Sequence, residues 1–450
     1  MKKVTFKGGV HPNDQKTFSR DIPFTVYEPK GDLVFPVSQH IGAPAVPVVK
    51  KGDEVLAGQI IAEAGGFVSA NIISSCSGKV KAIEKRTTAT GTKVQSIVIE
   101  NDGEFRTVEG IGTEVDYKTL TKEEILAKIK AAGIVGLGGA GFPTHVKLAP
   151  KNADAIEYVI ANGAECEPYI TCDDQLMRTR TNEIVTGMEI MLALFPNAKG
   201  VVLIEENKPE AIAAMKKACE GHSKVNVLEV QTKYPQGGER SVITVVTGKH
   251  LKLGMLPADL GCVVDNVATI FAIYEAVCKS TPLMVKGLTV SGDAIKKPSN
   301  FLVRIGTNCA ELVEAAGGIK DTVELKKAIS GGPMMGFAMA NLDVPIQKSN
   351  NAITLLGVDA VEEAFSQSTA CIRCGRCNMA CSLGLVPQMM ADAAIRKDYE
   401  RFENKLYGME CVACGCCTFV CPAKRPLMQL FKQTKAEIVA AKRAAQAAKQ

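Results

Sequence analysis

The sequence lacks a long apolar segment. Its 450 residues contain no run of 18 or more apolar residues, and the longest candidate, residues 263–278, is interrupted by Asp265, Asn266 and Glu275. A transmembrane helix needs about 20 predominantly apolar residues, so none is expected. The first ten residues, MKKVTFKGGV, include three lysines but no apolar stretch, so a secretory signal is not expected.

Familiar catalytic motifs are missing as well. There is no HExxH pair, no Walker loop and no pattern of a catalytic triad, and the five histidines (11, 40, 145, 222 and 250) have no metal-ligand spacing. The composition, with 46% hydrophobic and 22% charged residues, is that of a globular protein and excludes disorder throughout. At roughly 150 residues per domain, the length predicts about three domains.

The cysteines are unevenly distributed. Nine of the 16 lie between Cys371 and Cys421, and the other seven are scattered over the first 370 residues. A disulfide framework is typical of small secreted domains, and this chain is neither small nor visibly secreted. We interpret the scattered seven as buried small hydrophobic residues. The clustered nine need a separate explanation.

The positive charge is concentrated near the C-terminal end. From Pro422 onward seven basic residues stand against Glu437 alone, which gives +6 in 29 residues, whereas the whole chain carries +5. The remainder is therefore nearly neutral. We treat residues 431–450 as a basic tail, in which residues 435–450 are expected to form a solvated or fraying helix. Two roles stay open: contact with anionic lipid or an acidic partner, and simple exposure to solvent.

Residue patterns divide the chain into parts with different secondary structure. Residues 1–100 show short strands and turns, with a hairpin signal at Lys51–Asp53. Residues 101–120 have the composition of a linker. Residues 121–285 open with a capping box at Thr121–Glu124 and then alternate strands (155–161, 201–204) with helices (183–194, 209–219), which predicts an α/β domain. Residues 286–340 contain two strands and a short helix that suit a β-grasp module, and residues 365–430 hold the clustered cysteines.

The first part resembles the barrel-sandwich fold of lipoyl and biotinyl domains in its KGDEV and SGKV segments. That fold carries its cofactor on a lysine at a hairpin tip, but the corresponding residues 64–71 contain no lysine. We therefore expect an unmodified scaffold over residues 1–100.

The clustered cysteines form two sets with the same spacing, Cys-x2-Cys-x2-Cys-x3-Cys. This is the spacing of bacterial ferredoxins with two [4Fe–4S] clusters, in which the last cysteine of each set binds the other cluster. The crossed arrangement predicts one cluster on Cys371, Cys374, Cys377 and Cys421, and a second on Cys411, Cys414, Cys417 and Cys381. Two structural zinc sites are the competing interpretation, although zinc sites usually pair two Cys-x2-Cys units or add histidines. Cys416, beside Cys417, receives no role.

A glycine-rich loop spans residues 133–147, GIVGLGGAGFPTHVK. Closely spaced glycines allow positive φ and a close approach of the backbone to a phosphate, but they also serve in tight structural turns. Taken alone, the loop leaves both interpretations open.

The loop and the segments that follow it carry a resemblance to a known family. GLGGAGFPTHVK resembles the FMN- and NADH-binding loop of the flavoprotein subunit of respiratory complex I, and more closely that of the RnfC component of Rnf electron-transport complexes. ANGAECEP (161–168), GGERS (237–241) and DNVAT (265–269) are similar to later segments of that family, in the same order. TFKGGVHP, SQHIGAP and GGPMMG resemble RnfC in particular. The resemblance covers roughly residues 3–430.

The resemblance implies a multi-domain α/β and α+β fold. Its parts are an N-terminal barrel-sandwich hybrid (1–100), a Rossmann-like FMN/NADH-binding domain (121–285), an SLBB β-grasp module (286–340) and a helical ferredoxin-like domain with two [4Fe–4S] clusters (365–430), followed by the tail.

The resemblance also implies roles for individual residues. Gly136, Gly138, Gly139 and Gly141 would cradle FMN, and Lys147 would neutralise phosphate charge. The flavin ring or its ribityl chain would meet Asn162, Glu165, Asn266 and Thr269, Phe142 would stack on the adenine of NAD, and Gly238 and Glu239 would contact the dinucleotide. Leu137, Ala164 and Arg240 depart from the complex I pattern, which has arginine, aspartate and glutamate there. These departures leave the flavin site intact but the pose of NADH open.

The combined parts imply an electron-transfer subunit. NADH delivers a hydride, a [4Fe–4S] cluster accepts one electron, and a flavin converts between them. The resemblance implies an NAD-dependent oxidoreductase subunit, the peripheral component of an ion-translocating ferredoxin:NAD+ oxidoreductase (Rnf) complex. It would work with membrane and iron–sulfur subunits, with NAD(H) and indirectly with ferredoxin, but not with nucleic acid. It would lie on the cytoplasmic face of the cell membrane.

Two alternatives remain open. One is a soluble flavin/iron–sulfur reductase such as the cobalamin reductase of microcompartments, although in those relatives the flavin domain comes first. The other is a zinc-stapled scaffold without activity. The coupling ion, Na+ or H+, the cluster potentials and the net direction of electron flow do not follow from the sequence.

Overall fold

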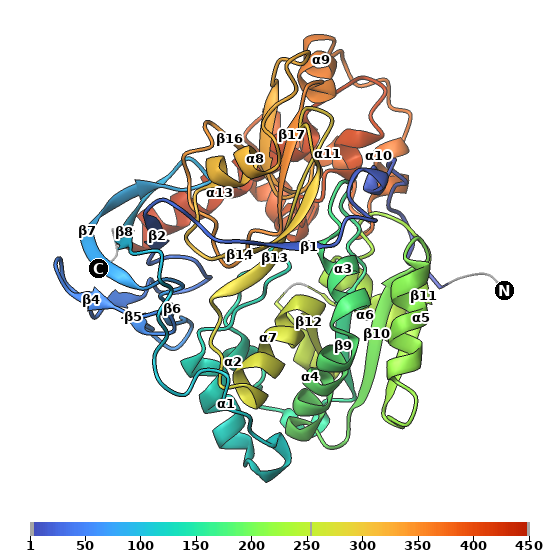
Figure 1. Ribbon diagram of the computed structural model, residues 1–450. Helices are drawn as coiled ribbons and strands as arrows, with labels where there is room; N and C mark the ends of the chain where they lie inside the picture. Colours follow the sequence, from blue (N-terminus) through green and yellow to red (C-terminus); the bar gives the residue numbers. More distant parts are fainter. Residues whose placement is uncertain (1–3, 253, 448–450) are drawn as a thin grey trace.

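The computed structural model describes residues 4–252 and 254–447. Figure 1 shows a β-rich N-terminal part, a parallel sheet flanked by helices, a mixed six-stranded sheet and a helical C-terminal part. The four sheets contain every named strand of the described residues.

The N-terminal part is a sandwich of two antiparallel sheets. One sheet has the order β2-β8-β7-β4 and the other β3-β5-β6. Their bounds are β2 (Leu33–Pro36), β3 (Val46–Pro47), β4 (Glu54–Val55), β5 (Ile60–Glu63), β6 (Ile72–Ile73), β7 (Gly78–Thr87) and β8 (Lys93–Asn101). Apolar side chains of both sheets, including Leu33, Phe35, Ile61 and Ile97, form a buried core between them.

The hairpin predicted at Lys51–Asp53 is wrong in its pairing. The turn is present, since the Asp53 amide donates to the Lys50 carbonyl at 3.1 Å. However, β3 before the turn pairs with β5, and β4 after it pairs with β7. The turn therefore carries the chain from one sheet of the sandwich to the other, and the alternating pattern cannot distinguish this from a hairpin.

The second part is a four-stranded parallel sheet with the order β11-β10-β9-β12. Its strands are β9 (Tyr158–Gly163), β10 (Lys199–Glu205), β11 (Val225–Val230) and β12 (Cys262–Asn266). The connecting helices are α3 (Cys172–Thr179), α4 (Thr181–Leu194), α5 (Pro209–Ala218), α6 (Glu239–Thr247) and α7 (Val267–Cys278), preceded by α1 (Lys122–Ala131) and α2 (Thr144–Lys147). The capping box predicted at the start of α1 is present.

Both faces of this sheet are covered, as a parallel sheet requires. One face packs Val159 and Val202 against α4 and α7, and the other packs Ile160 and Leu203 against α6 and the side chain of Phe6. Successive strand residues therefore alternate between two hydrophobic cores.

The third part is a six-stranded sheet with the order β1-β14-β13-β17-β15-β16. The strands are β1 (Phe24–Tyr27), β13 (Val285–Ser291), β14 (Ser299–Arg304), β15 (Lys327–Ser330), β16 (Phe337–Met339) and β17 (Ala352–Leu356), with helix α8 (Cys309–Ala315). Two strands lie outside the predicted range 286–340. β17 inserts between β13 and β15, and β1 comes from the part predicted as barrel. Neither pairing is local in sequence, so no turn signal reveals it.

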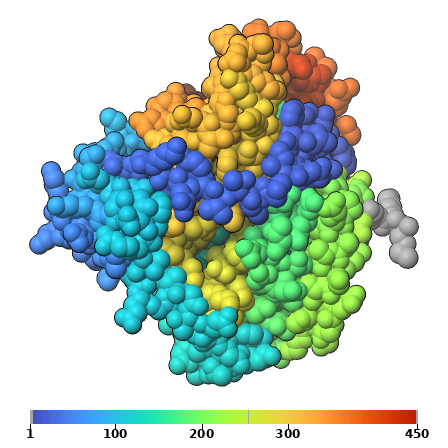
Figure 2. Space-filling model, viewed as in Figure 1, coloured from blue at the N-terminus to red at the C-terminus, as the bar shows by residue number. Residues whose placement is uncertain are grey.

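Residues 4–27, which we call the N-terminal strap, connect three parts of the molecule. Val4 bridges to Val230 and Val10 to Tyr234 beside the parallel sheet, and β1 pairs with β14. Between them, the Gly9 amide donates to the Ala380 carbonyl of the cysteine-rich part at 2.9 Å. In Figure 2 this dark-blue segment crosses the face of the molecule between the green and yellow-orange regions.

The C-terminal part is helical. It contains α9 (Ala360–Ser366), α10 (Arg376–Ala380), α11 (Pro387–Ile395), α12 (Cys416–Phe419) and α13 (Leu427–Ala447). The predicted tail is not a separate segment, because α13 begins before it and buries Phe431, Thr434 and Ile438 against α11. Beyond Ile438 the described part of the helix is exposed. Residues 448–450 of the predicted tail lie outside the described residues.

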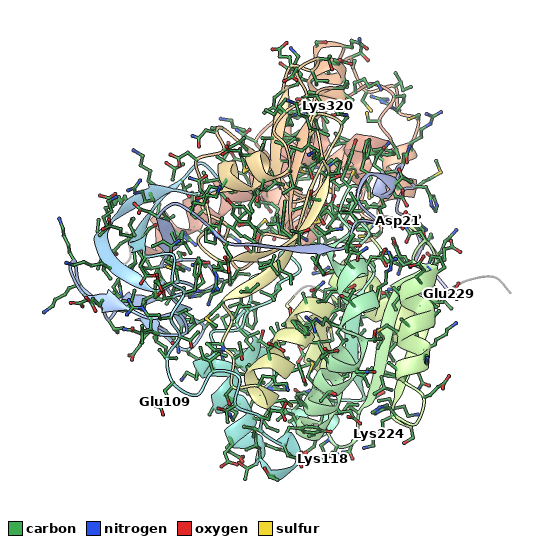
Figure 3. All side chains as sticks on the ribbon, viewed as in Figure 1. Asp21, Glu109, Lys118, Lys224, Glu229 and Lys320 are labelled. Carbon is green, nitrogen blue, oxygen red and sulfur yellow. The ribbon has the colours of Figure 1, made fainter. Side chains whose placement is uncertain are left out.

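Within the described residues, no helix combines the length and the apolar character that crossing a bilayer would require. Charged side chains such as Lys118, Lys224 and Lys320 lie at the periphery (Figure 3), where water solvates them.

Candidate functional site

The strand order of the parallel sheet creates a topological switch point. Strands β9, β10 and β11 progress to one side, and β12 returns to the other side of β9. Ligands of open α/β sheets bind at such a point, outside the carboxyl ends of the strands. Asn162 lies at the end of β9 and Asn266 at the end of β12, in adjacent register positions. Two predicted site residues thus meet where the fold favours a ligand.

The glycine-rich loop lies over this point. The buried Leu137 amide donates to Thr269 Oγ1 at 2.9 Å, which ties the loop to the first turn of α7. A Cβ on Gly138 would approach the Asn266 side chain to 3.0 Å, and Gly139 has φ +103°. Gly138, Gly139 and Ala140 are exposed, and within the described residues their amides make no hydrogen bond. The loop therefore presents free N–H groups beside Asn266.

The amides of Gly136 and Gly141, unlike those of Gly138 and Gly139, are hydrogen-bonded within the loop. The Gly136 amide donates to the Phe142 carbonyl at 2.9 Å, and the Gly141 amide donates to the Gly136 carbonyl at 2.9 Å. These bonds close the loop upon itself. Phe142 is half-buried where the loop ends.

Polar side chains form a connected network under the loop. Asn266 Oδ1 accepts from the Ala268 amide as the N-cap of α7, and its Nδ2 donates to Asp173 Oδ2 at 2.6 Å. Asn162 Nδ2 donates to the Gly237 carbonyl at 2.8 Å. The predicted residues Asn162 and Asn266 are thus held in fixed orientations by their neighbours.

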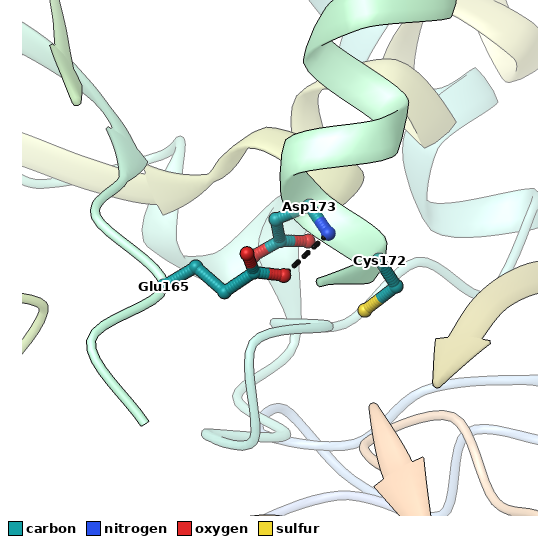
Figure 4. Close-up of side chains that lie close together, drawn as sticks. All are labelled: Glu165, Cys172 and Asp173. Atoms are coloured by element: carbon teal, nitrogen blue, oxygen red, sulfur yellow. Dashed lines mark hydrogen bonds between the residues drawn. The ribbon is translucent and has the colours of Figure 1, made fainter. Parts of the chain in front are cut away.

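Glu165 is buried beside Cys172 and Asp173, and Figure 4 shows the three side chains together. Its Oε1 accepts from the Asp173 amide at 2.7 Å, whereas its buried Oε2 has no hydrogen-bond partner. Burial raises the pKa of the Glu165 carboxyl and lowers the pKa of the Lys16 ammonium, 3.7 Å from it. Glu165 therefore holds an unsatisfied oxygen at the end of β9, close to Asn266's partner Asp173.

Lys147 does not project into open space. Its Nζ donates to the Val264 carbonyl at 2.7 Å and to Asp265 Oδ1 at 3.2 Å, and Glu239 lies 3.8 Å away. The two carboxylates raise the pKa of Lys147 against the opposing effect of burial. Its charge is therefore matched within the protein. Glu239, the first residue of α6 after Gly238, is the more exposed member of this set.

The three departures from the complex I pattern have structural explanations. Leu137 is buried in the core under the parallel sheet. Ala164 is buried, and its carbonyl accepts from Lys208 Nζ at 2.6 Å. Arg240 forms an ion pair with Glu410 of the C-terminal part at 2.6 Å. Each replacement therefore serves packing or an inter-domain contact.

The eight clustered cysteines surround two cavities in the crossed arrangement. The inner cavity is lined by Cys381, Cys411, Cys414 and Cys417, and the outer cavity by Cys371, Cys374, Cys377 and Cys421. None of the eight is in a disulfide. Four sulfur donors around one small space suit a [4Fe–4S] cluster or a tetrahedral zinc ion, and the repeated spacing with Pro422 favours the cluster.

The inner cavity lies against the switch-point side of the parallel sheet. Cys166, Tyr234, Cys414 and Cys416 belong to one packed cluster. The Cys416 thiol faces the Tyr234 carbonyl at 3.8 Å, and the Gly237 amide donates to Cys166 Sγ at 3.3 Å. Cys416 thus lines the inner cavity as a fifth cysteine and packs at the junction with the parallel-sheet part.

Sequence reasoning missed the charged residues that support this region. Lys16 Nζ donates to the Glu167 carbonyl at 3.1 Å and Lys208 to that of Ala164, so two buried ammonium groups hold the segment after β9. Glu167 in turn accepts from the amides of Met334 and Met335 at 3.0 and 2.8 Å. Lys16 and Lys208 carried no sequence signal, because single lysines outside a motif resemble surface residues.

The arrangement fits a flavin phosphate and ring. The free amides of the loop and the N-terminus of α7 can bind an anion, and the asparagines and the orphaned Glu165 oxygen offer polar contacts to a heteroaromatic ring. The position of Lys147 differs from the expected one, since Asp265 already neutralises it.

Comparisons with known proteins follow the same division of the chain. The family model of the Nuo51 FMN-binding domain matches residues 129–275, that of the RnfC barrel sandwich hybrid domain residues 4–104, and that of the SLBB domain residues 288–338. The RnfC component of the proton-translocating ferredoxin:NAD(+) oxidoreductase complex of Clostridium ljungdahlii is 47% identical over 434 residues, 96% of this chain and 94% of the relative. The chain belongs to the RnfC family.

A second RnfC relative differs in the ion that its name specifies. The corresponding component of the Na(+)-translocating ferredoxin:NAD(+) oxidoreductase complex of Acetobacterium woodii is 40% identical over 443 residues, 98% of this chain and 99% of the relative. The two names specify different ions, so membership does not decide the ion. A chain of the NAD+-reducing [NiFe]-hydrogenase in the H2-reduced state has a similar fold, with a TM-score of 0.51 and 19% identity over 74% of this chain and 67% of that one.

These matches confirm the predicted family and fold class. The RnfC relatives are components of oxidoreductase complexes, which also confirms the oxidoreductase interpretation.

Proposed function

We propose that this RnfC family member exchanges hydride with NAD(H) at bound FMN and passes single electrons through two [4Fe–4S] clusters to partner subunits of an ion-translocating ferredoxin:NAD+ oxidoreductase complex. FMN, when bound, can accept a hydride and release electrons one at a time. The FMN-binding family match and the names of the relatives support this function.

The observation that carries the proposal is the junction between the switch point and the inner cavity. Cys166, four residues after Asn162, packs in the same cluster as Cys414 of the inner cavity. The Arg240–Glu410 ion pair and the contact of Glu167 with Met334 and Met335 hold the neighbouring parts together. A flavin site and a one-electron site in such proximity suit direct electron transfer between them.

We assign the flavin contacts from the geometry of the loop. The amides of Gly138, Gly139 and Ala140 would bind phosphate, while Gly136, Gly141 and Thr269 shape the loop. Asn162, Glu165 and Asn266 would face the ring or ribityl chain. Phe142, Gly238 and Glu239, at the exposed edge, would contact the dinucleotide. Lys147 would act on phosphate only if its contact with Asp265 weakens.

We assign the cluster ligands from the two cavities. Cys381, Cys411, Cys414 and Cys417 would hold the inner cluster, and Cys371, Cys374, Cys377 and Cys421 the outer one. The order flavin, inner cluster, outer cluster then follows from the packing.

The chain would act as a peripheral subunit on the cytoplasmic face of the cell membrane, attached through membrane and iron–sulfur subunits and linked to ferredoxin through them. A free-standing reductase, such as a microcompartment cobalamin reductase, is not favoured, since the two relatives named above are subunits of ion-translocating complexes.

Anaerobic reconstitution tests this function. The chain should bind about eight irons and one FMN, and NADH should reduce both clusters, detected by electron paramagnetic resonance. Cys414→Ala should remove about half of the iron. Cys309→Ala, at a buried cysteine far from both cavities in sequence, should keep all of it. A flavin-free chain that contains zinc would contradict the proposal.

A further inference from the structure

The two cluster cavities differ in their exposure. The inner cavity is walled by Leu385, Met390 and Phe431 and adjoins the buried Cys416. At the outer cavity, Cys371 and Cys374 are exposed, and the side chain of Ile372 is 65% exposed. A cluster in the outer cavity would therefore lie at the molecular surface, within reach of another protein.

The surface around the outer cavity is strongly cationic. The two segments that form it, residues 371–377 and 421–427, contain Arg373, Arg376, Lys424 and Arg425 and no acidic residue. None of these four side chains forms an ion pair or a side-chain hydrogen bond anywhere in residues 4–252 and 254–447. The carboxylates that most closely precede the first segment, those of Glu362 and Glu363, lie at least eight residues before Cys371.

These charges are not explained by the cluster alone. A cluster held by four thiolates is anionic, and nearby cations could offset that charge. The inner cavity has the same four sulfur donors, yet the residues that line it include no charged side chain. Beside the inner cavity, Lys435 donates to the Cys411 carbonyl at 2.8 Å, whereas four cations belong to the two segments of the outer one. The excess of cations is therefore a property of the exposed site. Unpaired surface charge of one sign steers a partner of opposite charge toward an interface.

We propose that the surface formed by Ile372, Arg373, Arg376, Lys424 and Arg425, which we call the outer-cluster surface, docks an acidic face of a partner subunit that carries a one-electron cofactor. The inference rests on the proposed function and adds to it the exit point and the chemistry of the partner. Exposed Ile372 supplies an apolar contact beside the cations, and protein interfaces generally combine apolar and polar contacts.

Charge reversal at two of these cations tests the proposal. Arg376 and Lys424 are exposed and do not line the cavity, so Arg376→Glu/Lys424→Glu should leave the cluster intact. The matched control is Lys50→Glu/Lys51→Glu, an equal charge change at an exposed turn of the barrel. The purified protein is rebound to the rest of the complex, and the apparent Kd is measured in 50 mM and 500 mM NaCl. Iron content and reduction by NADH are recorded in parallel.

The reversal should raise the Kd about tenfold or more at 50 mM NaCl and much less at 500 mM, because salt shortens the reach of exposed charges. The control should bind as the wild type does. An unchanged Kd at 50 mM, or an increase that is the same at both salt concentrations, would overturn the proposal.

Other outcomes would assign the surface differently. Unchanged binding together with a shifted reduction potential would mean that the cations serve the cluster itself. A lost affinity for phosphatidylglycerol vesicles with unchanged binding to the complex would identify a membrane contact, and impaired reaction with added free ferredoxin alone would identify a soluble carrier. Each of these overturns the proposed partner. If NADH fails to reduce the wild-type clusters, the proposed function fails, but the Kd measurement still decides the docking surface.

Discussion

Single buried residues link the parts of this molecule. Lys348 is fully buried, and its Nζ donates to the carbonyls of Asn71 in the barrel and Gly133 at the start of the glycine-rich loop, the latter at 2.7 Å. Burial lowers the pKa of Lys348 to about 7. One lysine thus connects three parts of the chain at the cost of desolvating its ammonium group.

The Lys348 pKa predicts a pH dependence of stability. Between pH 7 and the ordinary lysine pKa of 10.5, the unfolded chain binds a proton at Lys348 that the folded chain does not. This group therefore makes stability rise with pH across that window, by at most about 1.4 kcal/mol per pH unit. Lys348→Met should remove this contribution. From pH 7.5 to 9.5, the unfolding temperature of the wild type should therefore rise relative to that of the variant. Lys118→Met, at an exposed site, is the control. If the unfolding temperatures of all three proteins change in parallel with pH, the prediction is refuted.

Thr269 supports the glycine-rich loop, which predicts an effect on flavin binding. Thr269→Val removes the acceptor of the buried Leu137 amide, and an unsatisfied buried donor costs about 1–3 kcal/mol. If about 1.4 kcal/mol of this cost is lost from the binding free energy of FMN, its affinity should fall roughly tenfold. Thr269→Ser keeps the hydroxyl and should bind nearly normally. Quenching of FMN fluorescence measures both, and equal affinities for the Val and Ser variants would be inconsistent with a role in shaping the loop.

At the scale of elements, helix α13 closes the inner cavity. Phe431 lines the cavity, packs near Phe402 at a ring-centroid distance of 6.1 Å and is fully buried. Phe431→Ala should cost about 3–5 kcal/mol locally and reduce iron binding at the inner cavity. Deletion of residues 440–450, whose described part is exposed, should leave the iron content unchanged. Iron analysis after reconstitution distinguishes the two, and normal iron in Phe431→Ala would show that the inner cavity does not need the Phe431 side chain.

Local patterns predicted the elements of the parallel sheet well. The expected helices 183–194 and 209–219 correspond to α4 and α5, because each combines a polar start with an apolar face. The strand pairing around the Lys51–Asp53 turn and the places of strands β1 and β17 in the six-stranded sheet were not predicted correctly. Their partners lie far away in the chain, and the preference of a short segment does not contain that information.

In the candidate site, too, features set by local sequence were predicted, and features set by distant contacts were not. The spacing of the eight cysteines predicted their grouping around two cavities, because each loop brings three of them together. Lys16, Lys208 and Asp173 act on the site only through tertiary contacts, so no local pattern singles them out. The pairing of Lys147 with Asp265 likewise depends on how β12 meets the loop.

At the scale of the whole molecule, the N-terminal strap packs closely between the parallel-sheet part and the cysteine-rich part. Gly8 has φ +83°, and a Cβ there would lie 2.7 Å from the Cys381 carbonyl oxygen. Gly8→Ala should therefore displace the strap and speed its cleavage in limited proteolysis. Gly52→Ala shares the backbone penalty, with φ +94°, but its Cβ would meet nothing within 4 Å. Equal cleavage of the strap in both variants would contradict a steric effect at Gly8.

The strap also orders events during synthesis. The hydrogen bond from Gly9 to Ala380 joins residues 371 positions apart, so it cannot form until most of the chain has left the ribosome. The parallel sheet can assemble from its own contiguous segments earlier, since domains usually fold as units during translation. Until then the strap can contact the parallel sheet at the edge strand β11, through the bridge of Val4 to Val230, but not the cysteine-rich part. Docking of the strap on the cysteine-rich part is therefore a late step of folding, in which the first segment of the chain meets a segment made much later.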